Sequence, residues 1–170
     1  WQAAFNGSDR SWVTSSGEDK YRRGIYVFWR RTTPYPSMTT FDAPSREACS
    51  IRRIRTNTPL QAFVTLNDPV YVEAAQALAR RILREGGTTA ESRARFGLQL
   101  CLVRPPQNSQ IQSVLKLFKA EEEHYREHVP EAKELAGINT APAGSSLSEL
   151  AGWTVVANVL LNLDGVLSKN

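Results

Sequence analysis

Two histidines one helical turn apart are the first residues of this chain whose spacing suggests a catalytic site. His124, Glu127 and His128 match the pattern H-x-x-E-H, in which both imidazoles bind zinc and the glutamate activates water. That chemistry also needs a third ligand on another element and a cleft that excludes water. Here the motif ends the most acidic stretch of the chain, shortly before Pro130, on a helix that we expect to be solvated. We therefore interpret it as a chance match and expect no metal site.

A second candidate is a segment that interleaves arginines with aromatic side chains. Nine cations lie between Lys20 and Arg55 against two carboxylates, so the segment carries +7, although the whole chain carries only +4. Guanidinium groups pair with phosphate or sulfate, and aromatic rings stack on bases or sugars. Alternatively, the aromatics belong to the core and the arginines pair with carboxylates of this chain or its neighbours. Consecutive arginines such as Arg22 and Arg23 favour this alternative, because they point to different faces of a regular element.

A third candidate lies where this segment meets a predicted helix start at Thr58. Three arginines precede that start: Arg52, Arg53 and Arg55. Cations are disfavoured beside the positive end of a helix dipole, so an anion should approach here. An anionic ligand could be held by the helix N-terminus together with Arg55. Otherwise the anion is a carboxylate of this chain, for which the candidates are Asp42, Glu47 and Asp68.

The two cysteines offer little chemistry. Two thiols are too few for a disulfide framework or a four-thiolate zinc site, and no histidine lies near either Cys49 or Cys101 to activate a nucleophile. Cys101 lies among leucines and valine, which predicts a buried free thiol. A disulfide between the two cysteines is geometrically allowed but not implied by the sequence.

The elements that must position these residues are helices. N-cap and capping-box patterns predict helix starts at Thr58, Asp68 and Ser146. Apolar residues at helical spacing, ended by Gly or Pro, predict helices over about 69–85, 90–104, 109–128 and 130–136, and a last helix that is apolar nearly all round. The predicted core faces are Val70, Ala74, Ala77, Leu78 and Ile82; Phe96, Leu100 and Val103; and Ile111, Val114, Leu115 and Phe118.

The fold class that follows is mainly α: a single compact helical domain of about five to six helices with a long irregular N-terminal segment. We divide residues 1–170 into a loop-like lead-in (1–19), a basic aromatic segment (20–55) and a helical body (56–170). At 170 residues and 41% hydrophobic content the chain can bury a real core. No apolar run approaches the ~20 residues that span a bilayer. The absence of a starting Met and of a signal-peptide pattern leads us to expect a piece of a longer protein.

Several blocks of the sequence together resemble one protein family. They are YRRGIYVFWRRT (21–32), PSMTTFDAPSRE (36–47), RRIRTNTPLQA (52–62), LNDP (66–69) and WTVVANVLLNLD (153–164). In order and length they resemble the C-terminal domain of unknown function of large, planctomycete-type extracytoplasmic proteins. The resemblance implies a secreted or periplasmic setting, behind a cytochrome-c-like haem domain. The haem-binding C-x-x-C-H pattern is absent from this chain, so we expect no cofactor in this domain.

We expect from the residues and the resemblance a noncatalytic helical interaction module. Its partners would be the upstream domains of the same polypeptide or an anionic polysaccharide; nucleic acid is disfavoured by the extracytoplasmic setting. An alternative is that the domain completes the active site of a redox or polysaccharide-processing enzyme acting on anionic glycans, with Asp42 or Asp68 as acid/base. The candidate ligand or domain-interface residues are Arg30, Asp42, Arg52, Arg53, Arg55, Asn57, Asn67 and Asp68.

Overall fold

A computed structural model describes residues 15–27, 34–45, 48–52, 56–138 and 144–167, and all regular elements within these ranges are helices. The mainly helical fold class is therefore confirmed. Contacts divide the chain into two compact units, Trp1–Thr56 and Asn57–Asn170. The division falls one residue beyond the point where the sequence placed the end of the basic aromatic segment.

The first unit contains only short helices in its described part. Two turns of 3-10 helix, Gly17–Tyr21 and Gly24–Tyr26, precede α1 (Pro36–Thr40). Pro36 opens α1, where its missing N–H costs no helical hydrogen bond. Thr40 Oγ1 donates back to the carbonyl of Pro36 at 3.0 Å. None of these three helices buries a residue, so this unit has no helical core of its own among the described residues.

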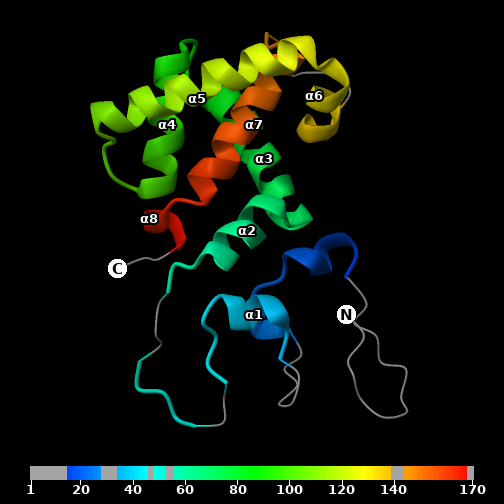
Figure 1. Ribbon diagram of the computed structural model, residues 1–170, viewed down its shortest axis with the longest axis vertical. Helices are drawn as coiled ribbons and strands as arrows, with labels where there is room; N and C mark the ends of the chain where they lie inside the picture. Colours follow the sequence, from blue (N-terminus) through cyan, green and yellow to red (C-terminus); the bar gives the residue numbers. More distant parts are fainter. Residues whose placement is uncertain (1–14, 28–33, 46–47, 53–55, 139–143, 168–170) are drawn as a thin grey trace. The chain divides into compact units, whose positions relative to one another are not determined.

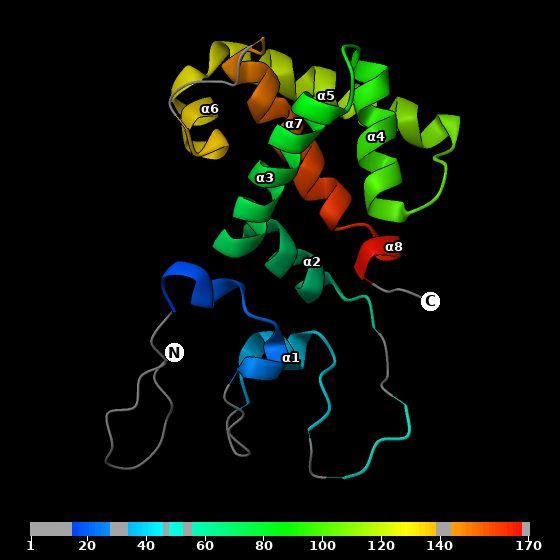
Figure 2. The same cartoon turned by 180° about the vertical axis from the view of Figure 1, so that it is seen from behind.

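The second unit is a bundle built around one central helix. α7 (Leu147–Leu161) runs through its middle and packs against α3 and α5, with α6 beside it (Figures 1 and 2). Trp153 of α7 is fully buried, and its ring stacks on Phe118 with the centroids 4.4 Å apart. The remaining helices are α2 (Pro59–Asn67), α3 (Pro69–Glu85), α4 (Ala90–Leu102), α5 (Asn108–Glu127), α6 (Val129–Ala136) and α8 (Asp164–Leu167).

Local capping signals define the helix starts as predicted. Thr58 and Gln61 form both hydrogen bonds of the capping box at the start of α2. At the start of α7 only half of the expected box forms. Ser146 Oγ accepts a hydrogen bond from the Glu149 N–H at 3.0 Å, but the Glu149 carboxylate pairs with Arg93 of α4. A partly buried cation thus takes the carboxylate that would otherwise return to the cap.

The predicted core face is right for α5 and shifted for α3 and α4, and α7, which the sequence predicts to be apolar nearly all round, is largely buried. Val70, Ala74 and Ala77 of α3 are exposed, and Val103 is 80% exposed because the chain leaves α4 there in a left-handed conformation, with φ of 55°. Small residues at the helix contacts explain the shift, since they let the helices approach closely. Ile82 of α3 is buried as predicted. The other side chains or glycines that these two helices bury are Ala75, Ala79 and Leu83 on α3 and Ala94, Gly97 and Leu98 on α4.

Candidate interaction surfaces

In the first unit, the predicted site residue Asp42 closes a loop. Its carboxylate accepts hydrogen bonds from the Thr56 N–H at 2.7 Å and from Thr56 Oγ1 at 2.9 Å. Asp42 itself has φ of 58°, a conformation that aspartate tolerates better than most residues. The two ends of the 43–55 loop are therefore held together. Among the described residues of that loop, Ile51 and Arg52 are exposed.

The predicted arginine site is only partly within the described ranges. Arg30, Arg53 and Arg55 lie outside the described residues. Arg52 is exposed and forms no ion pair with the described part of the chain. The idea that these arginines form one surface therefore stays a prediction.

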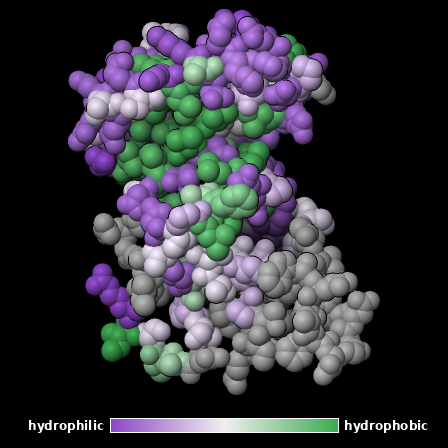
Figure 3. Space-filling view, viewed as in Figure 1, coloured by the Kyte–Doolittle hydropathy of each residue, from purple (hydrophilic) through white to green (hydrophobic). Residues whose placement is uncertain are grey.

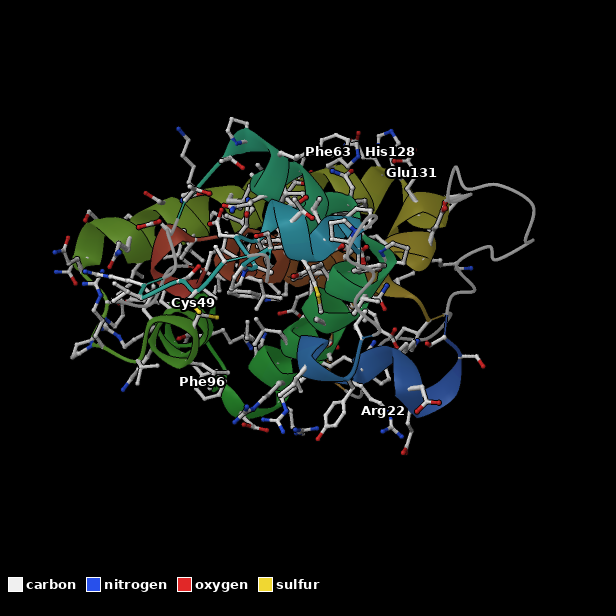
Figure 4. All side chains as sticks on the ribbon, turned by 90° about the horizontal axis from the view of Figure 1, so that it is seen from below. Arg22, Cys49, Phe63, Phe96, His128 and Glu131 are labelled. Carbon is white, nitrogen blue, oxygen red and sulfur yellow. The ribbon has the colours of Figure 1, made fainter. Side chains whose placement is uncertain are left out.

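A second cluster of the same character lies in the described part of the segment. Three cations and two aromatic rings gather within seven residues, and all of them are exposed. The Lys20 ammonium lies 4.8 Å from the centre of the Tyr21 ring. The guanidinium carbons of Arg22 and Arg23 lie 5.9 and 6.0 Å from the centre of the Tyr26 ring, within the range of cation–π contacts. Arg22, labelled in Figure 4, is also held by Asp19 at 2.6 Å. We call these five residues, Lys20, Tyr21, Arg22, Arg23 and Tyr26, the basic-aromatic patch.

The other three predicted site residues hold helix ends in the second unit. Asn57 Nδ2 donates to Asp164 Oδ1 of α8 at 2.9 Å, and Asn67 Nδ2 donates to the carbonyl of Phe63 at 2.8 Å. Asp68 Oδ1 accepts from the Val70 N–H at 2.9 Å and so caps α3. Burial, with a smaller contribution from the negative charge of Asp68, raises the pKa of Tyr71. Each of the three polar side chains therefore has a structural partner.

α2 presents a surface that no sequence motif predicts. Gln61 and Thr65 are 2% and 1% exposed, whereas Phe63, on the opposite side of the helix, is 64% exposed. Leu60 and Leu66 flank Phe63 and are also exposed. Apolar side chains gather over α2 in the space-filling view (Figure 3), and Phe63 is labelled in Figure 4. α2 is thus inverted relative to an ordinary surface helix, which buries its apolar stripe. We call Leu60, Phe63 and Leu66 the outward α2 face.

Hydrogen bonds, and not apolar packing alone, attach α2 to α7. Thr65 Oγ1 donates to Asn162 Oδ1 at 2.6 Å, directly after the end of α7. Asn158 Nδ2 of α7 donates to the carbonyl of Leu66 at 3.2 Å. Because the buried polar groups find these partners, α2 is fixed without use of its outward face. A sequence signal for this surface does exist: α2 contains no charged residue in a chain that is 22% charged.

A groove of about 940 Å³ lies between α3 and α6. Gln76 is one of the lining residues, and its Nε2 donates to the carbonyl of Leu135 at 2.8 Å. Gly137 ends α6 with φ of 66°, and a Cβ at this position would lie only 2.7 Å from Gln76 Oε1. Glycine is needed here both for the left-handed backbone and for the close approach of the glutamine amide.

The histidine motif does not form a zinc site in the described structure. The rings of His124 and His128 stack with centroids 4.3 Å apart, and His128 Nδ1 donates to the carbonyl of His124 at 2.8 Å. His124 Nε2 lies 3.6 Å from a Glu131 oxygen (Figure 4 labels His128 and Glu131). Across the residues that the structure describes, no three His, Cys, Asp or Glu side chains are grouped so as to hold a metal ion.

Both cysteines are free thiols. Cys49 is exposed, whereas Cys101 of α4 is half-buried, and burial raises the pKa of its thiol. The free thiol predicted at Cys101 is confirmed, but the side chain is half-buried against the core and not fully buried as predicted.

Taken together, the fold and the surfaces define a helical module whose most unusual feature is an exposed apolar helix face. The sequence model of PSD1, a family of proteins of unknown function (DUF1553), matches residues 2–118. The chain belongs to this family. No curated protein and no solved structure matches the chain. The match crosses the boundary between the two units and ends at Phe118, whose partner Trp153 lies beyond it. No helix in the described ranges is long and apolar enough to span a membrane.

Proposed function

We propose that this chain is a noncatalytic interaction module that packs on a preceding domain of the same polypeptide through the outward α2 face. The observation that carries the proposal is the inversion of α2, with Gln61 and Thr65 buried and Phe63 exposed. Exposed leucine and phenylalanine side chains on one helix contribute little to the stability of the second unit. Burying them against a partner is favourable, at about 25 cal/mol per Å² of apolar surface.

The chemistry of this face indicates an apolar partner surface. Since Pro59–Asn67 contains no ionisable side chain, a charged ligand would find no counter-charge on it, and an uncharged protein surface would lose no ion hydration in contact with it. The polar attachment of α2 to α7 keeps the face presented at a fixed angle. Such a rigidly held apolar anchor is typical of the centre of protein interfaces.

By resemblance, we also propose the setting: a larger, secreted or periplasmic protein of planctomycete type in which a cytochrome-c-like domain precedes this module. The haem chemistry would then belong to the upstream domain, and this module would supply contact surface.

The test is side-chain footprinting of the intact parent polypeptide and of this chain alone. We expect hydroxyl-radical labelling of Phe63 to be several-fold lower in the parent than in this chain alone. In the parent, Phe63→Ser should undock the module, so that limited proteolysis cleaves it from the preceding domain faster. Val129→Ser, which alters another exposed apolar side chain, is the matched control and should change neither. Equal labelling of Phe63 in both proteins would overturn the proposal.

A second candidate function is binding of an anionic ligand, supported by the basic-aromatic patch. Three cations beside two tyrosine rings could pair with sulfate or carboxylate groups of a polysaccharide while the rings stack on its sugars. Heparin is the probe. We expect salt-sensitive retention that Arg22→Ala/Arg23→Ala reduces, whereas the paired control Arg81→Ala/Arg84→Ala on α3 does not. Retention that both double variants reduce equally would indicate net charge alone and reject this candidate.

A further inference from the structure

The groove between α3 and α6 combines apolar side chains with charged ones. Val72, Leu135 and Ile138 of its lining are half-buried, whereas the two glutamates that α6 contributes are exposed. A surface of this kind can bury the apolar face of a ligand while the charged edge of the groove stays in contact with solvent. The lining includes the apolar residues Val72, Leu135 and Ile138 and the charged residues Glu131, Glu134 and Arg80.

The sign of the groove is opposite to that of the chain. Three carboxylates line it, with Glu73 as the third, against the single guanidinium of Arg80, while the chain carries a net charge of +4. Close opposite charges across an interface steer and orient a partner, and like charges exclude one. The groove therefore complements a basic partner and disfavours an acidic one.

The length of the groove matches that of a short helix. Its α3 wall runs from Pro69 to Arg80, which corresponds to about 16 Å at 1.5 Å rise per residue, or about three helical turns. The base is fixed before any ligand arrives, because the Gln76 amide bonds to the end of α6 and fills the space that Gly137 leaves. A pre-formed groove loses little conformational entropy on binding.

We propose that this groove binds a basic amphipathic helix of a partner protein. The apolar stripe of that helix would lie on Val72, Leu135 and Ile138, and its lysines or arginines would face Glu131 and Glu134, in the helix-in-groove mode of recognition. This inference goes beyond the proposed function, because it concerns a different surface from the outward α2 face and a partner of defined charge.

The experiment uses the full 170-residue chain and a fluorescein-labelled, 14-residue peptide of leucines and lysines whose leucines form one helical stripe. Fluorescence anisotropy measures binding at low salt, and amide chemical shifts locate it. Two control peptides keep the length: one has the same composition with leucines on all faces, and one has glutamate in place of lysine. Glu134→Lys reverses a lining charge, and Glu91→Lys reverses an exposed charge on α4, outside the groove.

We expect the striped basic peptide to bind, with shift changes at residues 72–80 and 131–138. Glu134→Lys should weaken binding about five- to tenfold, and Glu91→Lys less than about twofold. Leu135→Ser, checked for folding by circular dichroism, should also weaken it. Equal effects of the two charge reversals, equal binding of the scrambled peptide, preference for the acidic peptide, or shift changes confined to another surface would each overturn the proposal. So would self-association of the chain through this groove in the absence of peptide.

Because Phe63 is not one of the residues that line the groove, the effect of Phe63→Ser separates the two surfaces. Binding of the basic peptide should survive that substitution even where docking of the parent domain does not. Loss of peptide binding in Phe63→Ser would instead place the peptide on α2 and overturn the groove assignment.

Discussion

Apart from the four-residue helix α8, α2 and α7 are the most apolar helices of the second unit. They use their apolar residues in opposite ways. α7 buries Leu150, Trp153, Val156 and Leu160 within the bundle. α2 buries only Gln61 and Thr65 and exposes its leucines and phenylalanine. The difference teaches that apolar content alone does not locate a core: long-range partners decide which side of a helix is buried.

The strongest test of this comparison is removal of one large ring from each helix. Trp153→Ala deletes a fully buried indole stacked on Phe118 and should cost about 3–5 kcal/mol of the free energy of unfolding, measured by urea denaturation. Phe63→Ala removes an exposed ring and should change stability by less than about 0.5 kcal/mol. A comparable loss in both variants would contradict the contrast between the helices.

Should Trp153→Ala prove too unstable to measure, Trp153→Phe keeps the test open. Phenylalanine retains an aromatic stack on Phe118 and removes an indole N–H that has no hydrogen-bond partner in the described structure. We expect it to lose less stability than the alanine variant yet more than Phe63→Ala.

Close packing of α7 is tested by its buried glycine. A Cβ at Gly152 would lie 3.2 Å from the backbone nitrogen of Glu122, which cannot move aside without shifting α5. Gly152→Ala should therefore lower the free energy of unfolding by about 1–3 kcal/mol, although alanine favours a helix more than glycine. Gly97→Ala is the matched control: its Cβ would meet only the side-chain ends of Ile82 and Leu160. Gly97→Ala should lose less of the free energy of unfolding than Gly152→Ala. The reverse order would show that α7 and α5 are not closely packed at Gly152.

The polar attachment of α2 is tested by an isosteric change. Thr65→Val removes the hydroxyl that donates to Asn162 Oδ1 at 2.6 Å. The amide oxygen of Asn162 then loses this hydrogen bond. The expected loss is about 1–2 kcal/mol, measured by thermal and urea unfolding. Thr65→Ser keeps the hydroxyl and should lose less than the valine variant. If valine instead stabilises the chain, apolar packing and not hydrogen bonding holds α2 in place.

These helices also show what could be read from the sequence. Local signals placed the starts of α2, α3 and α7, because a cap depends on residues within one turn. α7 is apolar nearly all round, which is typical of a buried helix. The buried side of α3 could not be chosen, since Ala74 and Ala77 are as apolar as Ala75 and Ala79, and only packing against α7 distinguishes the two sides.

The candidate surfaces were harder to predict for the same reason. The outward α2 face depends on the bond from Thr65 to a residue 97 positions later, and the groove on the bond from Gln76 to a residue 59 positions later. No local pattern encodes such pairings. The charge of Asp42 near arginines predicts a ligand site, whereas in the structure its carboxylate bonds to Thr56, 14 residues later.

The smallest expected effect compares one thiol in each unit. Cys49 is exposed, whereas Cys101 is half-buried and burial raises the pKa of its thiol, because the thiolate is the form that loses hydration. Iodoacetamide should therefore modify Cys49 first, with Cys101 reacting more slowly and requiring higher pH. Cys49→Ser and Cys101→Ser, followed by mass spectrometry, assign each rate.

The same shift predicts a weak dependence of stability on alkaline pH. The folded state holds the Cys101 proton more tightly than the unfolded state does, so stability is complete below the ordinary thiol pKa. It falls as pH rises through the higher folded-state value. Cys101→Ser should flatten this decline, while Cys49→Ser should leave it unchanged. Equal alkylation rates at the two thiols, or an alkaline decline that persists unaltered in Cys101→Ser, would show that α4 does not shield its cysteine from solvent.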